Sequence, residues 1–237
     1  MDPGIAALAW LLIEGGVPIV VTGRTPAELR GQIIRAMLSI DPARPWVTLD
    51  GDEEMPTTDR LSAIVRGGVS LGLTLAADDL RDVLDRLTSA PIGLPEDAVR
   101  RLGIVCVADA FDDRARLSAV HYLRPAERDA EGHVQRRPPA VVATWDDVTG
   151  AHEHYAWAIT PELADRVDRS QADLEERLRD RERFLAEAAS QAAASTADWQ
   201  ASVIRYLSTE PARIPAPQHP AATPSPFHGG LTDPHDH

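Results

Sequence analysis

The sequence predicts an α/β fold with a mostly parallel sheet, a small antiparallel strand unit and C-terminal helices. Residues Val17 to Thr22 form a short apolar run that reaches Gly23 and precedes an amphipathic segment at residues 26–38, which indicates a strand, a turn and a helix. A second strand at Trp46 to Asp50 completes a β-α-β unit, which predicts parallel strands and a right-handed crossover. The continuous apolar run at residues 104–108 is typical of a strand buried on both faces of a parallel sheet.

The other elements follow from apolar periodicity and from helix caps. Asp78 or Asp79 can cap a helix at residues 80–87. Further helices are expected at residues 5–14, 57–66, 96–102, 160–194 and 198–207, and further strands at residues 69–75, 116–124, 140–145 and 152–157. The stretch from residue 160 is highly charged and carries an apolar stripe of Leu163, Val167, Leu174, Leu178 and Leu185. Such a stripe must be buried, either on this chain's own sheet or against a partner.

These elements divide the chain into four units. Residues 1–110 form the α/β core, residues 111–160 extend it with antiparallel strands, and residues 161–208 form a C-terminal helical segment. Residues 209–237 are rich in Pro and His. We expect this tail to be disordered, because such a composition cannot bury enough apolar surface to offset the entropy of ordering.

Composition limits the class of protein. With 237 residues, of which 43% are apolar, the chain can bury one substantial core. Its net charge of −13 argues against a surface for nucleic acid or for an anionic membrane. The single cysteine, Cys106, lies in an apolar run and excludes an internal disulfide. The apolar run at residues 5–13 is too short to cross a bilayer, so we expect a cytoplasmic protein that is not an integral membrane protein.

The turn after the first strand lies where a nucleotide-binding protein has its phosphate loop. Such a loop needs glycines that free the backbone, converging N–H groups and a lysine. Here Pro26 removes one N–H, no glycine follows Gly23 until Gly31, and the chain contains no lysine. Residues 25–28, Thr-Pro-Ala-Glu, instead predict a capping box, with Thr25 as the N-cap and Glu28 folding back on it.

The order of motifs resembles the C-terminal motor domain of the type II/IV secretion ATPases, most closely the archaeal pilus and flagellum subgroup. Residues 7–16 are similar to the family's helix before the phosphate loop, residues 47–55 to its acidic box, and residues 73–87 to its histidine box. Further similar segments follow in order at residues 91–95, 104–107, 181–185 and 204–207. The resemblance covers residues 6–208 and implies a reduced P-loop NTPase core of the RecA-like type.

The resemblance also implies the residues of a vestigial site. Its nucleotide-binding positions are Gly23, Arg24, Thr25, Arg30 and Gly31, and its acidic-box remnant is Asp50, Asp52, Glu53 and Glu54. The departures fall on the chemistry, because the phosphate-loop lysine would lie at Leu29 or Arg30 and the histidine-box histidine at Ala76. Residues 56–66 are too few for a Walker B segment, and we expect no counterpart of the family's N-terminal domain.

Three functions remain open. The first is a catalytically inactive, structural or regulatory protein of a type II/IV secretion or pilus assembly system, with no cofactor and no catalytic residue. Its expected partner is a motor ATPase or an inner-membrane platform protein, and a homo-oligomer is possible. The second is an active NTPase that uses ATP and Mg²⁺, with Arg30 in place of the lysine and Glu54 polarising water. The third is a helical adaptor that binds a partner through the C-terminal helix and tail.

Three groups of residues are of metal-ligand type, but none of them predicts a metal site. His152 and His154 lie on one face of an expected strand, where no third ligand is visible in the sequence. The acidic residues at positions 50–54 offer oxygen ligands for Mg²⁺ or Ca²⁺, but a solvated acidic turn is the simpler interpretation. The tail histidines, His219, His228, His235 and His237, offer only adventitious metal affinity.

Overall fold

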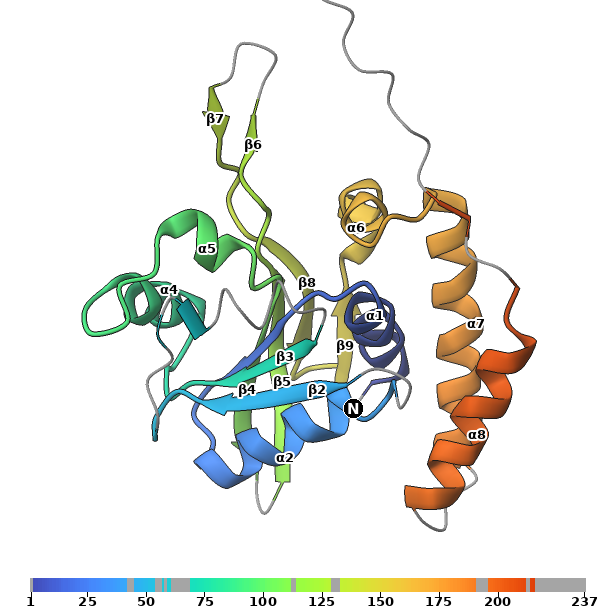
Figure 1. The fold of residues 1–237 in the computed structure, drawn as a ribbon. Helices are drawn as coiled ribbons and strands as arrows, with labels where there is room; N and C mark the ends of the chain where they lie inside the picture. Colours follow the sequence, from blue (N-terminus) through green and yellow to red (C-terminus); the bar gives the residue numbers. More distant parts are fainter. Residues whose placement is uncertain are drawn as a thin grey trace, which may run out of the picture.

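The fold is organised around one mixed sheet of seven strands in the order β2-β3-β1-β4-β5-β8-β9 (Figure 1). The structure is a computed structural model and describes residues 2–41, 45–53, 57, 59–60, 69–111, 114–128, 133–190, 196–211 and 214–215. The strands of the sheet are β1 Ile19–Thr22, β2 Trp46–Asp50, β3 Ser70–Thr74, β4 Ile104–Phe111, β5 Arg114–Tyr122, β8 Ala140–Asp146 and β9 Ala151–His154. Strands β6 Glu127–Arg128 and β7 Val134–Gln135 pair separately, as an arm that projects from the body (Figure 1).

The first four strands are parallel, and the last three continue the sheet in antiparallel fashion. The predicted α/β class, the parallel core and the antiparallel unit are therefore confirmed. Strand β3 lies between β1 and β2, so the crossover from β1 through α2 to β2 passes over one intervening strand. As a result, the carboxyl end of β1 has β3 on one side and β4 on the other.

Helices cover both faces of the parallel half of the sheet (Figure 1). They are α1 Pro3–Glu14, α2 Ala27–Leu38, α4 Leu80–Thr88, α5 Glu96–Arg100, η1 Ala156–Ile159, α6 Thr160–Arg166, α7 Gln171–Ser190 and α8 Thr196–Thr209. Ile19 and Val21 of β1 pack in the cluster formed with α1 and α2, whereas Val20 packs in the cluster formed with α4 and α5. This alternation follows the period of two along a strand.

Helix α1 is enclosed on all sides. Nine consecutive residues, Ile5 to Ile13, are buried, because the sheet lies on one side of the helix and α7 and α8 on the other. A helix that is apolar all round is stable in water only when it is buried in this way. The apolar helix expected near the N-terminus is therefore the centre of the hydrophobic core.

The single helix predicted from residue 160 is wrong, because the chain breaks it at residues 167–170. Asp168 adopts a positive φ of 52°, and Arg169 turns toward Glu14 at the end of α1. The apolar stripe crosses this break and is buried within the chain, with Leu163, Val167 and Leu174 at most 2% exposed. It packs mainly in the clusters that contain α1, where Leu185 is 8% exposed and Leu178 is partly buried, so most of the stripe is covered by this chain itself.

Several smaller expectations have mixed outcomes. Asp79 caps α4 as predicted, through a hydrogen bond from the Asp82 N–H to its carboxylate at 2.9 Å. The last helix begins at Thr196, two residues before the predicted start. The helix expected at residues 57–66 and the tail lie mostly outside the described residues. In the part of the chain that is described, no helix is both long and apolar enough to cross a membrane.

Candidate functional site

The carboxyl end of β1 is the place where an open α/β sheet of this order would bind a ligand. The connection after β1 runs through α2 toward β2, whereas the connection after β3 runs through α4 and α5 to β4. Adjacent strands whose connections leave in opposite directions form a topological switch point, and ligands bind in the crevice outside it. The predicted site residues Gly23 and Thr25 lie at this crevice.

The crevice is closed on its β3 side by the chain's own hydrogen bonds. The Thr22 hydroxyl lies 2.9 Å from the Leu75 carbonyl oxygen and 2.6 Å from that of Ala77. The N–H of Gly23 donates to the carbonyl of Ala77 at 2.8 Å, and the N–H of Leu75 donates to the carbonyl of Val21 at 3.1 Å. The segment after β3 is therefore joined to the end of β1, and the Gly23 N–H is not free for a ligand.

On the β4 side, the loop lies directly against backbone. Gly23 has a φ of +110°, and a Cβ atom added there would lie 2.0 Å from the carbonyl oxygen of Ala108. The hydroxyl of Thr25 donates to the same oxygen at 3.3 Å. This glycine therefore permits a close approach to a neighbouring strand, whereas a phosphate-loop glycine makes room for a ligand.

The predicted capping box at the start of α2 is wrong. The N-cap is Pro26, and it makes no side-chain cap hydrogen bond. Thr25 is 5% exposed and points inward, because the carbonyl of Ala108 is a buried acceptor that its hydroxyl can satisfy. Glu28 is exposed to solvent in the first turn of the helix.

Arg30 is one of the two positions, with Leu29, to which the resemblance assigns the phosphate-loop lysine. Its side chain is 6% exposed, and its guanidinium donates to the Thr25 carbonyl and to the Asp52 carboxylate. The other oxygen of Asp52 accepts the N–H of Ala76 at 2.7 Å. Residues from the predicted phosphate loop, acidic box and histidine box are therefore joined by one chain of hydrogen bonds.

These hydrogen bonds hold three segments of the chain together and do not leave a free cation for a ligand. The only basic side chain directed into the site is already neutralised by Asp52, among the residues that the structure describes. Arg30 is the buried member of this pair and Asp52 is partly exposed, so removing the carboxylate would leave a largely buried guanidinium with one partner fewer. An incoming phosphate would have to take the guanidinium from Asp52 and leave that carboxylate unpaired.

The remaining predicted site residues do not join this group. Arg24 points to solvent with 73% of its side chain exposed and reaches Asp109 at 3.3 Å. Gly31 lies inside α2, and Glu53 is exposed in the turn after β2. Glu54 lies outside the described residues. Asp50 accepts the N–H of Asp52 at 2.9 Å and so shapes this turn.

The paired histidines of β9 each have a separate protein contact. A ring nitrogen of His152 lies 2.8 Å from the Leu117 carbonyl oxygen, and the ring packs edge-on against Trp145 at 5.0 Å. A ring nitrogen of His154 lies 3.2 Å from the carboxylate of Asp2. Within the described ranges, no three or more His, Cys, Asp or Glu side chains are grouped as metal ligands.

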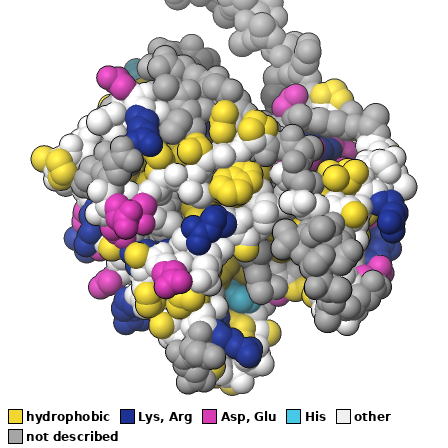
Figure 2. Space-filling view, turned by 60° about the horizontal axis from the view of Figure 1, so that its bottom comes forward, with side chains coloured by type: hydrophobic (Ala, Val, Ile, Leu, Met, Phe, Trp, Pro, Cys, Tyr) yellow, Lys and Arg dark blue, Asp and Glu magenta, His cyan; other side chains and the backbone are white. Residues whose placement is uncertain are grey.

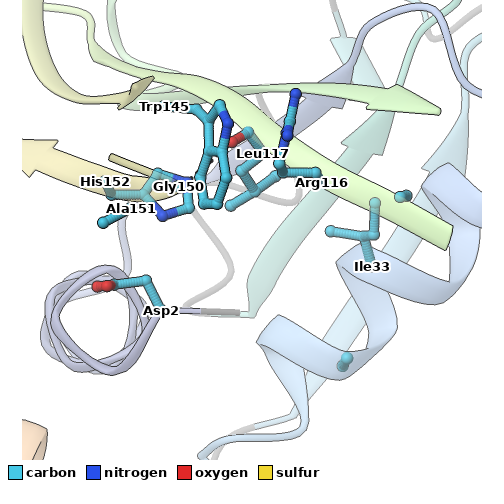
Figure 3. Close-up of a pocket in the computed structure, with 10 residues that line it drawn as sticks. Asp2, Ile33, Arg116, Leu117, Trp145, Gly150, Ala151 and His152 are labelled. Atoms are coloured by element: carbon cyan, nitrogen blue, oxygen red, sulfur yellow. Dashed lines mark hydrogen bonds between the residues drawn. The ribbon is translucent and has the colours of Figure 1, made fainter. Parts of the chain in front are cut away.

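Sequence reasoning missed a groove of about 480 Å³ at the same edge of the sheet, where β5 begins beside the end of β4. It lies between the start of α1, helix α2 and the ends of β5, β8 and β9, with Trp145, Leu117 and Ile33 around it (Figure 3). The Arg116 guanidinium stacks on the rings of Phe111 and Trp145, at 4.9 and 4.4 Å from their centroids. With this end of the molecule turned forward, hydrophobic side chains are interspersed with charges of both signs (Figure 2).

A scan against models of protein families finds no match for this chain, and a search of curated proteins finds no relative. The residues at the end of β1 therefore carry the functional proposal.

Proposed function

We propose that this protein is a catalytically inactive relative of the type II/IV secretion ATPases and acts in or beside a pilus or secretion motor by binding another protein. The observation that carries the proposal is the contact between Arg30, Asp52 and Ala76. These residues occupy the positions of three family motifs, which are far apart in sequence and meet at one point. The Asp52 carboxylate accepts hydrogen bonds from the Arg30 guanidinium and from the Ala76 backbone N–H, so the three segments pack together around groups that are already paired.

The geometry at the end of β1 also supports the proposal that this site does not bind nucleotide. At the end of β1, Gly23 donates its N–H to Ala77 and Pro26 has none to donate, so two of the donors that a phosphate loop would use are missing. A carboxylate such as that of Asp52 at about 5 Å from one phosphate charge costs about 3 kcal/mol at an effective dielectric constant of about 20. Binding would require both the loop and the Arg30–Asp52 pair to rearrange.

Calorimetric titration of the full chain with ATP and Mg²⁺ tests the inactive site. We expect no binding up to about 1 mM nucleotide, which corresponds to less than about 4 kcal/mol of binding free energy. A dissociation constant in the micromolar range would contradict the proposal. In that case Arg30→Ala would identify the alternative, because an active site that uses Arg30 must lose its affinity with that side chain.

The partner half of the proposal has its own test. The purified chain should bind the intact secretion or pilus motor ATPase of the same genome and change its rate of ATP hydrolysis. A motor ATPase that neither binds the chain nor changes its turnover in its presence would contradict this half. The result is independent of the nucleotide titration, because it measures the activity of the other protein.

A further inference from the structure

Helix α8 packs on α1 and α7 at the outside of the molecule (Figure 1). Val203 is its fully buried residue, at 0% exposure, among the α8 side chains that the structure describes. Tyr206 stacks on Phe184 with ring centroids 4.5 Å apart, and Trp199 lies at 6.0 Å from the same ring. Just after the helix, Glu210 accepts two hydrogen bonds from Arg181 of α7, at 3.0 and 2.8 Å.

The contact residues of α8 follow a regular helical spacing. Trp199, Val203, Tyr206 and Glu210 stand at positions i, i+4, i+7 and i+11, so the first three share one face of the helix and Glu210 continues the series. The opposite side of the helix carries Ile204, which is 58% exposed. The helix thus meets the body along a narrow stripe that ends in a charge, which is the pattern of an amphipathic helix bound in a groove.

The surface under α8 contains two polar groups that this packing does not satisfy. The indole N–H of Trp10 and one terminal nitrogen of Arg181 are buried and have no hydrogen-bond partner in the described part of the chain. The two side chains are in contact, with the guanidinium 4.4 Å from the Trp10 ring centroid. A buried donor without a partner is unfavourable and regains water when its cover leaves, so these groups lower the cost of undocking α8.

We propose that the face of α1 and α7 under α8 is a helix-binding groove, which α8 occupies in this structure and from which a partner's helix can displace it. The partner helix is amphipathic, with large apolar or aromatic residues at positions i, i+4 and i+7 and a carboxylate near i+11 that meets Arg181. This chemistry is read from α8 itself, which serves as the template. The inference rests on the proposed function only in that the latter requires a protein partner.

The test uses the chain's own helix as the probe, so its outcome is separate from that of the nucleotide and motor experiments. In the full chain, Val203→Asp places a carboxylate in the buried stripe and should release α8 while leaving the groove residues unchanged. Hydrogen exchange should then rise in α8 and remain unchanged in β1 and β4. A labelled peptide of residues 196–211 should bind this variant at least about 10-fold more tightly than it binds the unmodified chain, in which tethered α8 competes at a high effective concentration.

Matched controls define the outcomes. Ile204→Asp lies on the exposed side of the same helix and should leave both exchange and peptide binding as in the unmodified chain. A peptide that carries Val203→Asp itself should not bind. The proposal is overturned if Val203→Asp raises hydrogen exchange in β1 and β4 as well as in α8, because α8 then unfolds together with the sheet as one cooperative core. It is equally overturned if the folded variant does not bind the unmodified peptide.

Discussion

Gly23 is the residue at which the backbone is most constrained. Its φ of +110° is unfavourable for any residue with a side chain, and an added Cβ would meet the Ala108 carbonyl oxygen at 2.0 Å. We therefore expect Gly23→Ala to lower the free energy of unfolding by more than about 3 kcal/mol, as measured by denaturant titration. Gly150 is the matched control, because its φ is +67° but nothing lies within 4 Å of its added Cβ. Gly150→Ala should cost only about 1 kcal/mol, and equal losses at both positions would contradict the role of the Ala108 contact.

Arg30 shows how far sequence can define the site at the residue scale. Its position after the first strand, and the absence of lysine from the chain, predict a changed phosphate loop. Its pairing with Asp52 could not be predicted, because the two residues are separated by the whole of β2 and meet only through the order of the strands. The same holds for Thr25, whose hydroxyl reaches Ala108, 83 residues later in the chain.

The starts of α2 and α4 give a test at the scale of the element. Asp79 caps α4 through the Asp82 N–H, whereas Glu28 at the start of α2 is exposed and the N-cap there is Pro26. We expect Asp79→Ala to cost about 1 kcal/mol of folding free energy and Glu28→Ala less than about 0.5 kcal/mol, as measured by denaturant titration. Thr25→Ala should cost about 1 kcal/mol, because it removes a buried donor from the Ala108 carbonyl. A larger loss of folding free energy for Glu28→Ala than for Asp79→Ala would support the predicted capping box at the start of α2.

The elements themselves were largely predictable, since most are determined by local patterns. The apolar runs before Gly23 and at residues 104–108 became central strands, and the Asp-rich start of α4 became its cap. The predictions fail where the local structure depends on a contact with a residue that is distant in sequence. The break between α6 and α7 brings Arg169 to Glu14, which is 155 residues away, and no local pattern shows that contact.

Across the whole molecule, Glu14 joins the core to the C-terminal helices. It ends α1, accepts a hydrogen bond from Arg169 at 2.7 Å and pairs with Arg181 at 2.6 Å. Arg181 is fully buried and also holds Glu210 beyond α8. Burial alone would raise the pKa of Glu14, but the attraction of Arg181 and Arg169 outweighs it, so the pKa lies below its ordinary value.

This pairing makes a pH-dependent contribution to stability. A carboxylate with a lowered pKa stabilises the folded state fully above the pKa of a free glutamate, about 4.3, and the contribution is lost as the pH falls through the folded-state pKa. Glu14→Gln should therefore lower the free energy of unfolding by about 2–3 kcal/mol at pH 7, because it leaves Arg181 and Arg169 with less compensation at a site partly screened by water. Denaturant titrations between pH 3 and pH 7 should show the difference from the unmodified protein shrinking toward acid. Glu187→Gln, on the exposed side of α7, should stay within about 0.5 kcal/mol at every pH. If Glu14→Gln lowers the free energy of unfolding equally at pH 3 and pH 7, the charge of Glu14 makes no contribution. The effect would then come from packing or hydrogen bonding of the side chain.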